Sequence, residues 1–406
     1  MTHQPGSRGF SEAVVDLVDP ERWLIFSHSG PSCQWISVRS RVTPFPEQGL
    51  KLHLSAMPQT AEEVLRRAAP VLLEGNISFK FAATQFDLQN LLNGRGGLTQ
   101  VGKFLTIYPP DSEEAVRLGL HLEQLTSDLS GPHIPYEPAL GPQSIVHYRY
   151  GAFARFELQQ DIGRIVHALK DPDGQLRLDD RSSNNARSDA FAEAGVPVWQ
   201  RTYETVLRDR YLRLETLAEN RKGLQCLGLD IGNPKLGAVV IKEAHAGVAL
   251  DANGLDGRGR LENEACALRA LKSCPRVPTF IDFWHAADRS FLVYCFVEGT
   301  NLASLLGELA NSGRSISVDQ LWKWASSLWN CLREVHCRGL LFGDLKPSNI
   351  IVDRTGELHL IDFELAQAPE SGLYPGFGTR GYSSPEQLTG QKLGFHARSR
   401  PSSAST

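Results

Sequence analysis

The chain has 406 residues, of which 41% are hydrophobic, and its formal net charge is −4. This length fits two or three domains with sizeable cores. The slightly acidic balance, without a long run of basic residues, argues against a nucleic-acid-binding protein, and no apolar stretch approaches the length needed to cross a membrane.

The seven cysteines are odd in number and scattered, and none of them forms a Cys-x-x-Cys or Cys/His pattern of the kind that binds zinc. The N-terminus has no apolar segment like that of a secretory signal peptide. We therefore expect free thiols, no zinc and a cytoplasmic location.

The first half of the chain mixes strand-like and helix-like patterns. Apolar and polar residues alternate in four segments, as in half-buried strands: 49–55, 77–82, 104–108 and 145–150. Helical spacing of apolar residues at 61–73 and 111–125 falls between these segments. This order predicts an α+β domain over residues 1–170.

The polar faces of these strands carry cationic and acid–base side chains. Apolar neighbours would pack into the core, while Lys51, His53, Lys80, Tyr108 and Arg149 would point the other way. The strand segments themselves contain no carboxylate to balance the charge. The cluster predicts a phosphate site, although each residue taken alone would equally suit an ordinary solvated strand face.

The chemistry that such a cluster suits is β-elimination of phosphate from a phosphorylated Ser or Thr. A base must remove the weakly acidic Cα proton, and an acid must protonate the departing phosphate. We expect Lys80 to be the base, because desolvation between Phe79 and Phe81, with cations nearby, favours the neutral amine. His53 as an imidazolium would be the acid, and Arg149 would grip the phosphate.

The middle of the chain predicts a boundary. The stretch 171–197 opens with almost no apolar content and is typical of a linker. Strand patterns then dominate up to residue 298, and helical periodicity returns at 301–309 and 318–336. We therefore expect a second domain over 198–390, followed by a polar tail at 391–406.

The second domain contains the groups that phosphoryl transfer from a nucleotide requires. Asp344 can accept the proton of an attacking hydroxyl, and Lys346 follows it in the same catalytic loop. Asn349 and Asp362 can hold magnesium on the phosphates. These residues resemble the catalytic and metal-binding loops of protein kinases, and the resemblance implies a bilobal kinase fold.

Four more positions follow from the resemblance to protein kinases. Lys242, at the end of a β-branched strand, resembles the lysine that contacts nucleotide phosphates. Glu264 stands where kinases place the glutamate partner of this lysine, whereas Glu262 faces another side of the helix. Gly223 lies in the loop that would cover the phosphates, and Glu298 lies in the hinge that would hold a purine.

Several features depart from the kinase pattern. The phosphate-covering loop at 219–225 has one glycine where kinases have several, and Phe342-Gly343 replaces the usual His-Arg ahead of the catalytic aspartate. Glu364 stands where kinases have the glycine of the metal-binding loop. About twenty residues follow Glu386, without helical periodicity, so we expect an incomplete C-terminal lobe.

The first half resembles the phosphothreonine-lyase-like domain of class III lanthipeptide synthetases, in which a lyase, a kinase and a cyclase domain follow one another. The matching segments are 51–56, 61–65, 79–81, 102–109 and 148–153. Members of this family also carry an arginine that contacts phosphate. Here Arg95 or Lys103 would take its place.

The resemblance implies a peptide dehydratase without its cyclase. The kinase half would phosphorylate Ser or Thr of a precursor peptide, with its leader and Ser/Thr-rich core, using ATP or GTP and Mg²⁺. The lyase half would expel the phosphate, and a separate cyclase could close the thioether rings. Two alternatives stay open: a lyase whose inactive kinase half only docks peptides, and a truncated remnant without enzymatic activity.

Overall fold

Contacts within the chain divide it into two units in the computed structural model, which describes residues 9–30, 32–154, 156–159, 165–171, 173–179, 190–197, 199, 203–250, 254–368, 378–379, 381–385 and 387. The first unit comprises Met1–Glu204 with Asn220–Lys222 and Ala246–Leu250, and the second comprises the rest of the chain. The tail expected at 391–406 lies outside the described residues.

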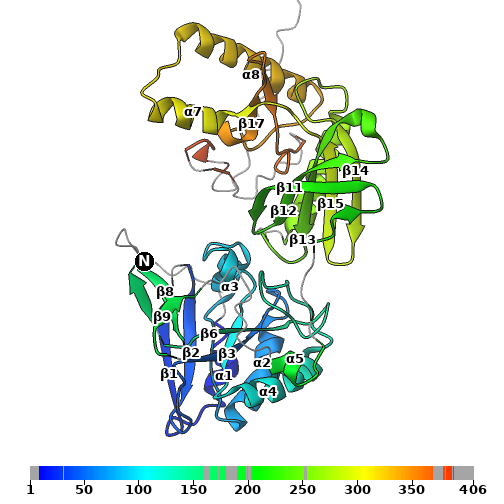
Figure 1. Ribbon diagram of the computed structural model, residues 1–406. Coiled ribbons are helices and arrows are strands. Elements are labelled where there is room, and N and C mark those ends of the chain that lie inside the picture. Colours follow the sequence, from blue (N-terminus) through cyan, green and yellow to red (C-terminus); the bar gives the residue numbers. More distant parts are fainter. Residues whose placement is uncertain are drawn as a thin grey trace, which may run out of the picture. The chain divides into compact units, whose positions relative to one another are not determined.

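A six-stranded antiparallel sheet forms the centre of the first unit (Figure 1). Its strands lie in the order β1-β2-β4-β5-β3-β6. Their bounds are β1 Trp23–Ser29, β2 Gln34–Ser40, β3 Gln48–Leu54, β4 Ser78–Ala82, β5 Leu105–Tyr108 and β6 Val146–Ala152. The four alternating segments of the sequence thus become the four strands β3 to β6, which lie next to one another in the sheet.

Helices cover the apolar face of this sheet. α2 (Ala61–Glu74) contacts β4, and α4 (Ser112–Thr126) contacts β3. Apolar residues of α2 at spacings of three and four, from Ala61 to Leu72, are fully buried. Asp111 caps α4 by accepting a hydrogen bond from the N–H of Glu114 at 2.8 Å. The other helices are α1 (Glu12–Val15), α3 (Gln85–Leu92) and the 3₁₀ turn η1 (Leu98–Gln100).

The stretch predicted as a linker is partly structured. A small antiparallel sheet of β7 (Glu157–Gln159), β8 (Ile165–Lys170) and β9 (Leu176–Leu178) enters it, and the short helix α5 (Ala190–Glu193) follows. Phe191 of α5 is fully buried, and its ring centroid lies 4.2 Å from that of Tyr148. Part of the stretch predicted as a linker is therefore regular structure: β9, which is exposed, pairs with β8, and α5 is anchored by the burial of Phe191.

A second six-stranded sheet begins the second unit, in the order β10-β11-β12-β13-β15-β14. Its strands are β10 Val206–Leu207, β11 Tyr211–Asn220, β12 Gly223–Asp230, β13 Ala238–His245, β14 Phe280–Ala286 and β15 Arg289–Cys295, with the 3₁₀ turn η2 at Pro234–Leu236. α6 (Gly257–Ala270) contacts β13 and β15 and buries Glu264 on the side that faces the sheet.

The rest of the second unit is mainly helical. β16 (Thr300–Asn301), β17 (Ile350–Val352) and β18 (Leu358–Leu360) form a small sheet beside α7 (Leu302–Asn311), α8 (Val318–Cys337) and the 3₁₀ turn η3 (Pro347–Asn349). α7 and α8 agree with the helical patterns at 301–309 and 318–336. The prediction of an α+β fold, with a kinase-like domain in second place, is confirmed.

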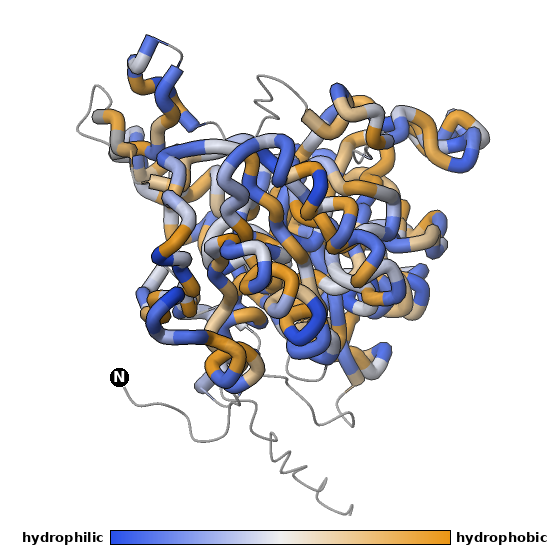
Figure 2. The backbone as a smooth tube through the Cα atoms, turned by 90° about the horizontal axis from the view of Figure 1, so that it is seen from below, coloured by the Kyte–Doolittle hydropathy of each residue, from blue (hydrophilic) through white to orange (hydrophobic). Residues whose placement is uncertain are grey.

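Apolar segments are short along the whole tube drawn in Figure 2, where orange and blue stretches alternate. Among the described residues, no helix is both long enough and apolar enough to cross a membrane. The buried apolar residues described here form three core clusters, one in the first unit and two in the second.

Candidate active sites

The register of the central sheet brings the predicted lyase residues into two neighbouring rows. Lys80 of β4 lies opposite Thr106 of β5, and Thr106 lies opposite His53 of β3. Two residues further along β3, Lys51 lies opposite Arg149 of β6. Because residues two apart on a strand share a face, both rows lie on the sheet face opposite the helices.

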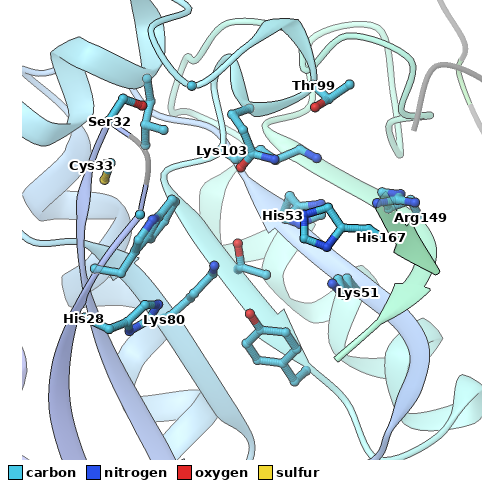
Figure 3. A pocket seen from close by; sticks show the side chains of 17 residues that line it. His28, Ser32, Cys33, Lys51, His53, Lys80, Thr99, Lys103, Arg149 and His167 are labelled. Carbon is cyan, nitrogen blue, oxygen red and sulfur yellow. The ribbon is translucent and has the colours of Figure 1, made fainter. Parts of the chain in front are cut away.

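A cavity of about 340 Å³ opens on this face (Figure 3). Six predicted residues line it: Lys51, His53, Lys80, Lys103, Tyr108 and Arg149. Arg95 is exposed and is not among the lining residues, although its neighbour Gly96 is. Of the two candidates for the extra phosphate contact, the structure therefore places Lys103 at the cavity and Arg95 outside it.

A buried carboxylate that sequence reasoning missed holds two of these residues. Glu137 lies with its Oε2 2.7 Å from His53 Nδ1 and its Oε1 2.6 Å from Lys103 Nζ. All three side chains are at least nine-tenths buried. Glu137 comes from the loop between α4 and β6, where no strand or helix periodicity marks it.

The protonation state of His53 differs from the prediction. Burial lowers the pKa of His53 to about 3; Glu137 opposes this effect, and Lys103 and Lys51 add to it. Burial alone would raise the pKa of Glu137, but His53 and Lys103 outweigh it and lower that pKa well below its usual value. Before substrate binds, His53 is therefore a neutral ring that donates its Nδ1–H to Glu137, and not the imidazolium that we expected.

The surroundings of Lys80 also differ from the prediction. Phe79 and Phe81 are fully buried on the opposite face of the sheet, because alternate strand residues face opposite sides. The aromatic neighbour of Lys80 is Trp35 of β2, whose ring centroid lies 4.3 Å from the Lys80 Nζ. Lys80 is thus partly desolvated by an indole face rather than by two phenyl rings.

Arg149 has a carboxylate partner as well. Its Nη2 donates to Oδ1 of Asp179, which follows β9 and is almost fully buried. Asp179 falls in the stretch predicted as a linker, so no local pattern pairs it with a strand residue 30 positions away. The contact fixes one side of the Arg149 guanidinium while the residue still lines the cavity.

Other lining residues were not predicted. They include His28, Cys33, Trp35, Thr99, Gln100, Thr106 and His167. The alternation of β1 and β2 could have pointed to His28 and Trp35, whereas Thr99 and Gln100 lie in a short 3₁₀ turn without a usable pattern. Burial raises the pKa of Cys33 to about 12, so its thiol is not a nucleophile at neutral pH.

In the second unit, one lysine lies between two carboxylates. Lys242 Nζ lies 2.7 and 2.8 Å from the two carboxylate oxygens of Glu264 and 2.9 Å from Oδ1 of Asp362. Burial alone would lower the pKa of Lys242, but Asp362 and Glu264 outweigh it and raise that pKa well above its usual value. The predicted pairing with Glu264 is therefore the one that the structure contains.

The catalytic loop is held by short polar contacts. Asp344 Oδ2 lies 2.6 Å from Lys346 Nζ, and Asp344 Oδ1 accepts a hydrogen bond from Thr379 Oγ1 at 3.0 Å. Asn349 Nδ2 donates to the backbone carbonyl and to Oδ2 of Asp344. These bonds orient the Asp344 carboxylate and leave the side-chain oxygen of Asn349 available to a cation.

The unusual Phe342-Gly343 pair has a structural reason. The ring of Phe342 packs edge-on against that of Phe363, with centroids 4.9 Å apart. Gly343 has a φ of 84°, and a Cβ there would lie 2.3 Å from the carbonyl oxygen of Leu365. An apolar contact and a close backbone approach thus join the catalytic loop to the segment after Asp362.

Two predicted nucleotide contacts have other partners in the structure. A Cβ on Gly223 would lie 2.1 Å from the carbonyl oxygen of Glu243, so strand packing alone explains this glycine. The Glu298 side chain is exposed and lies 3.2 Å from Arg354, also exposed. A role in purine binding would have to fall to the backbone of this hinge.

No group of three or more His, Cys, Asp or Glu in the described part of the chain is arranged to hold a metal ion. Asn349 and Asp362 would contribute amide and carboxylate oxygens, the donors that Mg²⁺ takes when phosphates and water complete its shell. The residues present therefore fit a magnesium ion that arrives with a nucleotide.

Comparison with known proteins agrees with this division. Residues 15–189 match the model of the RamC N-terminal domain, and residues 238–397 match that of the protein kinase domain. The chain therefore contains a segment similar to the RamC N-terminal domain, called the RamC-type domain below, followed by a segment similar to protein kinase domains. This confirms the predicted resemblance to class III lanthipeptide synthetases.

Individual relatives show the same two parts. The chain is 30% identical to the probable SapB synthase of Streptomyces coelicolor over 86% of its own length, and it spans 38% of that synthase. It is also 30% identical to the serine/threonine-protein kinase pkn2 of Myxococcus xanthus, over 46% of this chain and 22% of the relative. The mitosis inhibitor protein kinase mik1 of Schizosaccharomyces pombe is 32% identical over 34% of this chain and 24% of its own length.

The neutral state of His53 can be measured directly. We expect NMR of imidazole-labelled protein to show His53 as the Nδ1–H tautomer from neutral pH down to about pH 4, because its pKa is lowered to about 3. The unfolded chain would bind this proton near the ordinary value of 6.5, so burial of His53 makes folding less favourable as the pH falls through this range. Titration of His53 near pH 6.5 would contradict the assignment.

Proposed function

We propose that this protein dehydrates Ser and Thr residues of a precursor peptide in two steps. The kinase domain transfers a phosphoryl group to the side-chain hydroxyl, and the RamC-type domain eliminates the phosphate to leave dehydroalanine or dehydrobutyrine. The observation that carries the proposal is the cavity in which Lys51, His53, Lys80, Lys103 and Arg149 meet, with no acidic side chain among the described residues that line it. Similarity to the SapB synthase supports the same reading.

Lys80 is the proposed base of the elimination. Its neutral amine would take the proton from Cα of the phosphorylated residue, and the electron pair of that bond would form the Cα–Cβ double bond. The bond from Cβ to the phosphate oxygen would then break. Cations in the same cavity favour the neutral amine, because a like charge nearby disfavours protonation. Lys51, Lys103 and Arg149 would bind the phosphate oxygens.

His53 is the proposed acid, and it would acquire its proton together with the substrate. A phosphate dianion in the cavity would stabilise an imidazolium beside the Glu137 carboxylate. Nε2 of His53 would then protonate the departing phosphate. In this scheme Glu137 is a positioning residue that fixes the ring through Nδ1, and Tyr108 contributes a further donor to the cavity.

For the kinase step, Asp344 would accept the proton of the Ser or Thr hydroxyl, and Lys346 beside it would neutralise the transferred phosphoryl group. Lys242, held by Glu264, would contact the phosphates of ATP or GTP, and Asn349 and Asp362 would hold Mg²⁺. When bound, Mg²⁺ neutralises charge that develops on the phosphates.

The proposed partners follow from the similarity to synthetases. The substrate would be a precursor peptide with a leader and a Ser/Thr-rich core, and a separate cyclase could close the rings in the cytoplasm.

A second function is favoured by one observation: Gly223, which we expected in the phosphate loop, has a packing role. In that case the kinase domain would dock peptides without phosphorylating them.

Two substitutions distinguish the activities proposed for the two domains. With a precursor peptide, nucleotide and Mg²⁺, we expect Lys80→Ala to accumulate phosphopeptide, because the proton at Cα is not removed. Asp344→Ala should block phosphorylation but still act on a synthetic phosphopeptide. Mass spectrometry of the peptide distinguishes the products. Identical behaviour of the two variants would contradict the division of labour, and an inactive wild-type kinase with an active lyase would favour the docking role.

Glu137→Gln tests the positioning role. The amide keeps the size of the side chain but loses the charge that stabilises an imidazolium, so elimination from a phosphopeptide should slow by at least about ten-fold. The limb of the pH–rate profile that reports loss of the His53 proton should also move to lower pH. Glu62→Gln, which changes an exposed residue of α2, is the control. A rate loss without a shifted profile would indicate that Glu137 has a structural role alone.

A further inference from the structure

A second cavity of about 250 Å³ adjoins the first on the same face of the sheet. The two share His28, Lys80 and Tyr108 as lining residues. The other lining residues are mainly phenylalanines, together with Ser37, Val38 and Ser78. They also include one arginine that the proposed elimination does not use, Arg39 of β2. Its position beside Lys80 suggests that it receives the part of the substrate next to the reacting residue.

Arg39 lies over an aromatic platform formed by Phe45 and Phe26. Its guanidinium carbon lies 4.1 Å from the ring centroid of Phe45 and 5.7 Å from that of Phe26. Phe45 is itself supported by Tyr108 and Phe153, with ring centroids 5.2 and 5.9 Å away. Stacking of this kind orients the planar guanidinium and leaves its N–H donors at the edge.

Charge in this region is unbalanced. Among the described residues, Arg39 forms no ion pair with a carboxylate, and no acidic residue is among those that line the second cavity. By contrast, Lys103 and Arg149 of the first cavity have Glu137 and Asp179. The pKa of His28 is lowered by burial and by the charges of Lys80 and Arg39, which is consistent with a positive field between them. The complement of such a subsite is an anion.

Strand geometry sets the distance between Arg39 and the residue that reacts at Lys80. Ser37 is the register partner of Lys80, and Arg39 lies two residues further along β2. Two residues of a strand span about 7 Å, and neighbouring strands lie about 5 Å apart. Side chains one or two residues apart in an extended peptide are separated by about 4 to 7 Å. An acidic side chain that close to the phosphorylated residue can therefore reach Arg39.

We propose that Arg39 binds the carboxylate of an Asp or Glu within two residues of the phosphorylated Ser or Thr, so that the RamC-type domain prefers acidic flanking sequence. This inference rests on the proposed elimination for its biological meaning. The contact is a binding contact, outside the bond-making steps, and it should therefore affect KM and leave kcat nearly unchanged.

The test uses synthetic phosphoserine peptides that differ in one flanking residue, Glu or Gln, placed one or two positions before or after the phosphoserine. Binding is measured by fluorescence anisotropy, and elimination by mass spectrometry, with full-length protein. We expect the better-placed Glu peptide to have a KM about five-fold lower than its Gln counterpart, as for a solvent-exposed ion pair. This difference in KM should decrease at high salt concentration.

Arg39→Gln should remove the preference for Glu and leave the Gln peptides unaffected. Arg41→Gln is the matched control, since Arg41 lies two residues further on, is exposed and does not line the cavity. Equal binding of Glu and Gln peptides by the wild type, or an undiminished preference in Arg39→Gln, would overturn the subsite while elimination itself stands. Discrimination in binding without any elimination would support the subsite and overturn the lyase.

Discussion

Crowding positive charge on one face of a β-sheet is the constraint on which the first unit depends. Like charges at this distance repel one another, and repulsion grows as the site is shielded from water. Glu137 and Asp179 relieve it, one from a loop and one from the end of β9, and both are almost fully buried. Neither carboxylate lines the cavity. These buried carboxylates therefore stabilise the cations, while the cavity itself keeps an excess of positive charge that would attract an anion.

The balance of charge at the kinase site is the opposite, because carboxylates outnumber the lysines there. Lys242 is shared by Glu264 and Asp362, and Asp344 has Lys346 as its partner. A nucleotide would bring further negative charge to a place that already holds several carboxylates, and magnesium would offset that charge. In the proposed elimination, lysine and arginine of the RamC-type domain would instead bind the phosphate directly. The two domains would thus use phosphate sites of different charge balance.

Local sequence patterns predicted those features of the sites that depend on strand alternation and on motif spacing. The period of two placed Lys51, His53 and Lys80 on one face, and it did so because their apolar neighbours must enter the core. The kinase loops were likewise recognisable, since each of their groups lies within a few residues of the next. What escaped prediction depends on pairing between distant segments. Glu137 and Asp179 reach strand residues 84 and 30 positions away, and nothing near them in the sequence indicates a partner. The lowered pKa of His53 before substrate binds follows from its burial and from that pairing, and it escaped prediction for the same reason.

The central claim is that the cation-rich cavity removes phosphate by elimination, independently of the kinase domain. The most direct test is mass spectrometry of a synthetic phosphoserine peptide incubated with the full-length protein in the absence of nucleotide and magnesium. The account predicts loss of the elements of phosphoric acid, leaving dehydroalanine that can be trapped by a thiol. An unchanged phosphopeptide, or hydrolysis to the unmodified serine peptide, would contradict it.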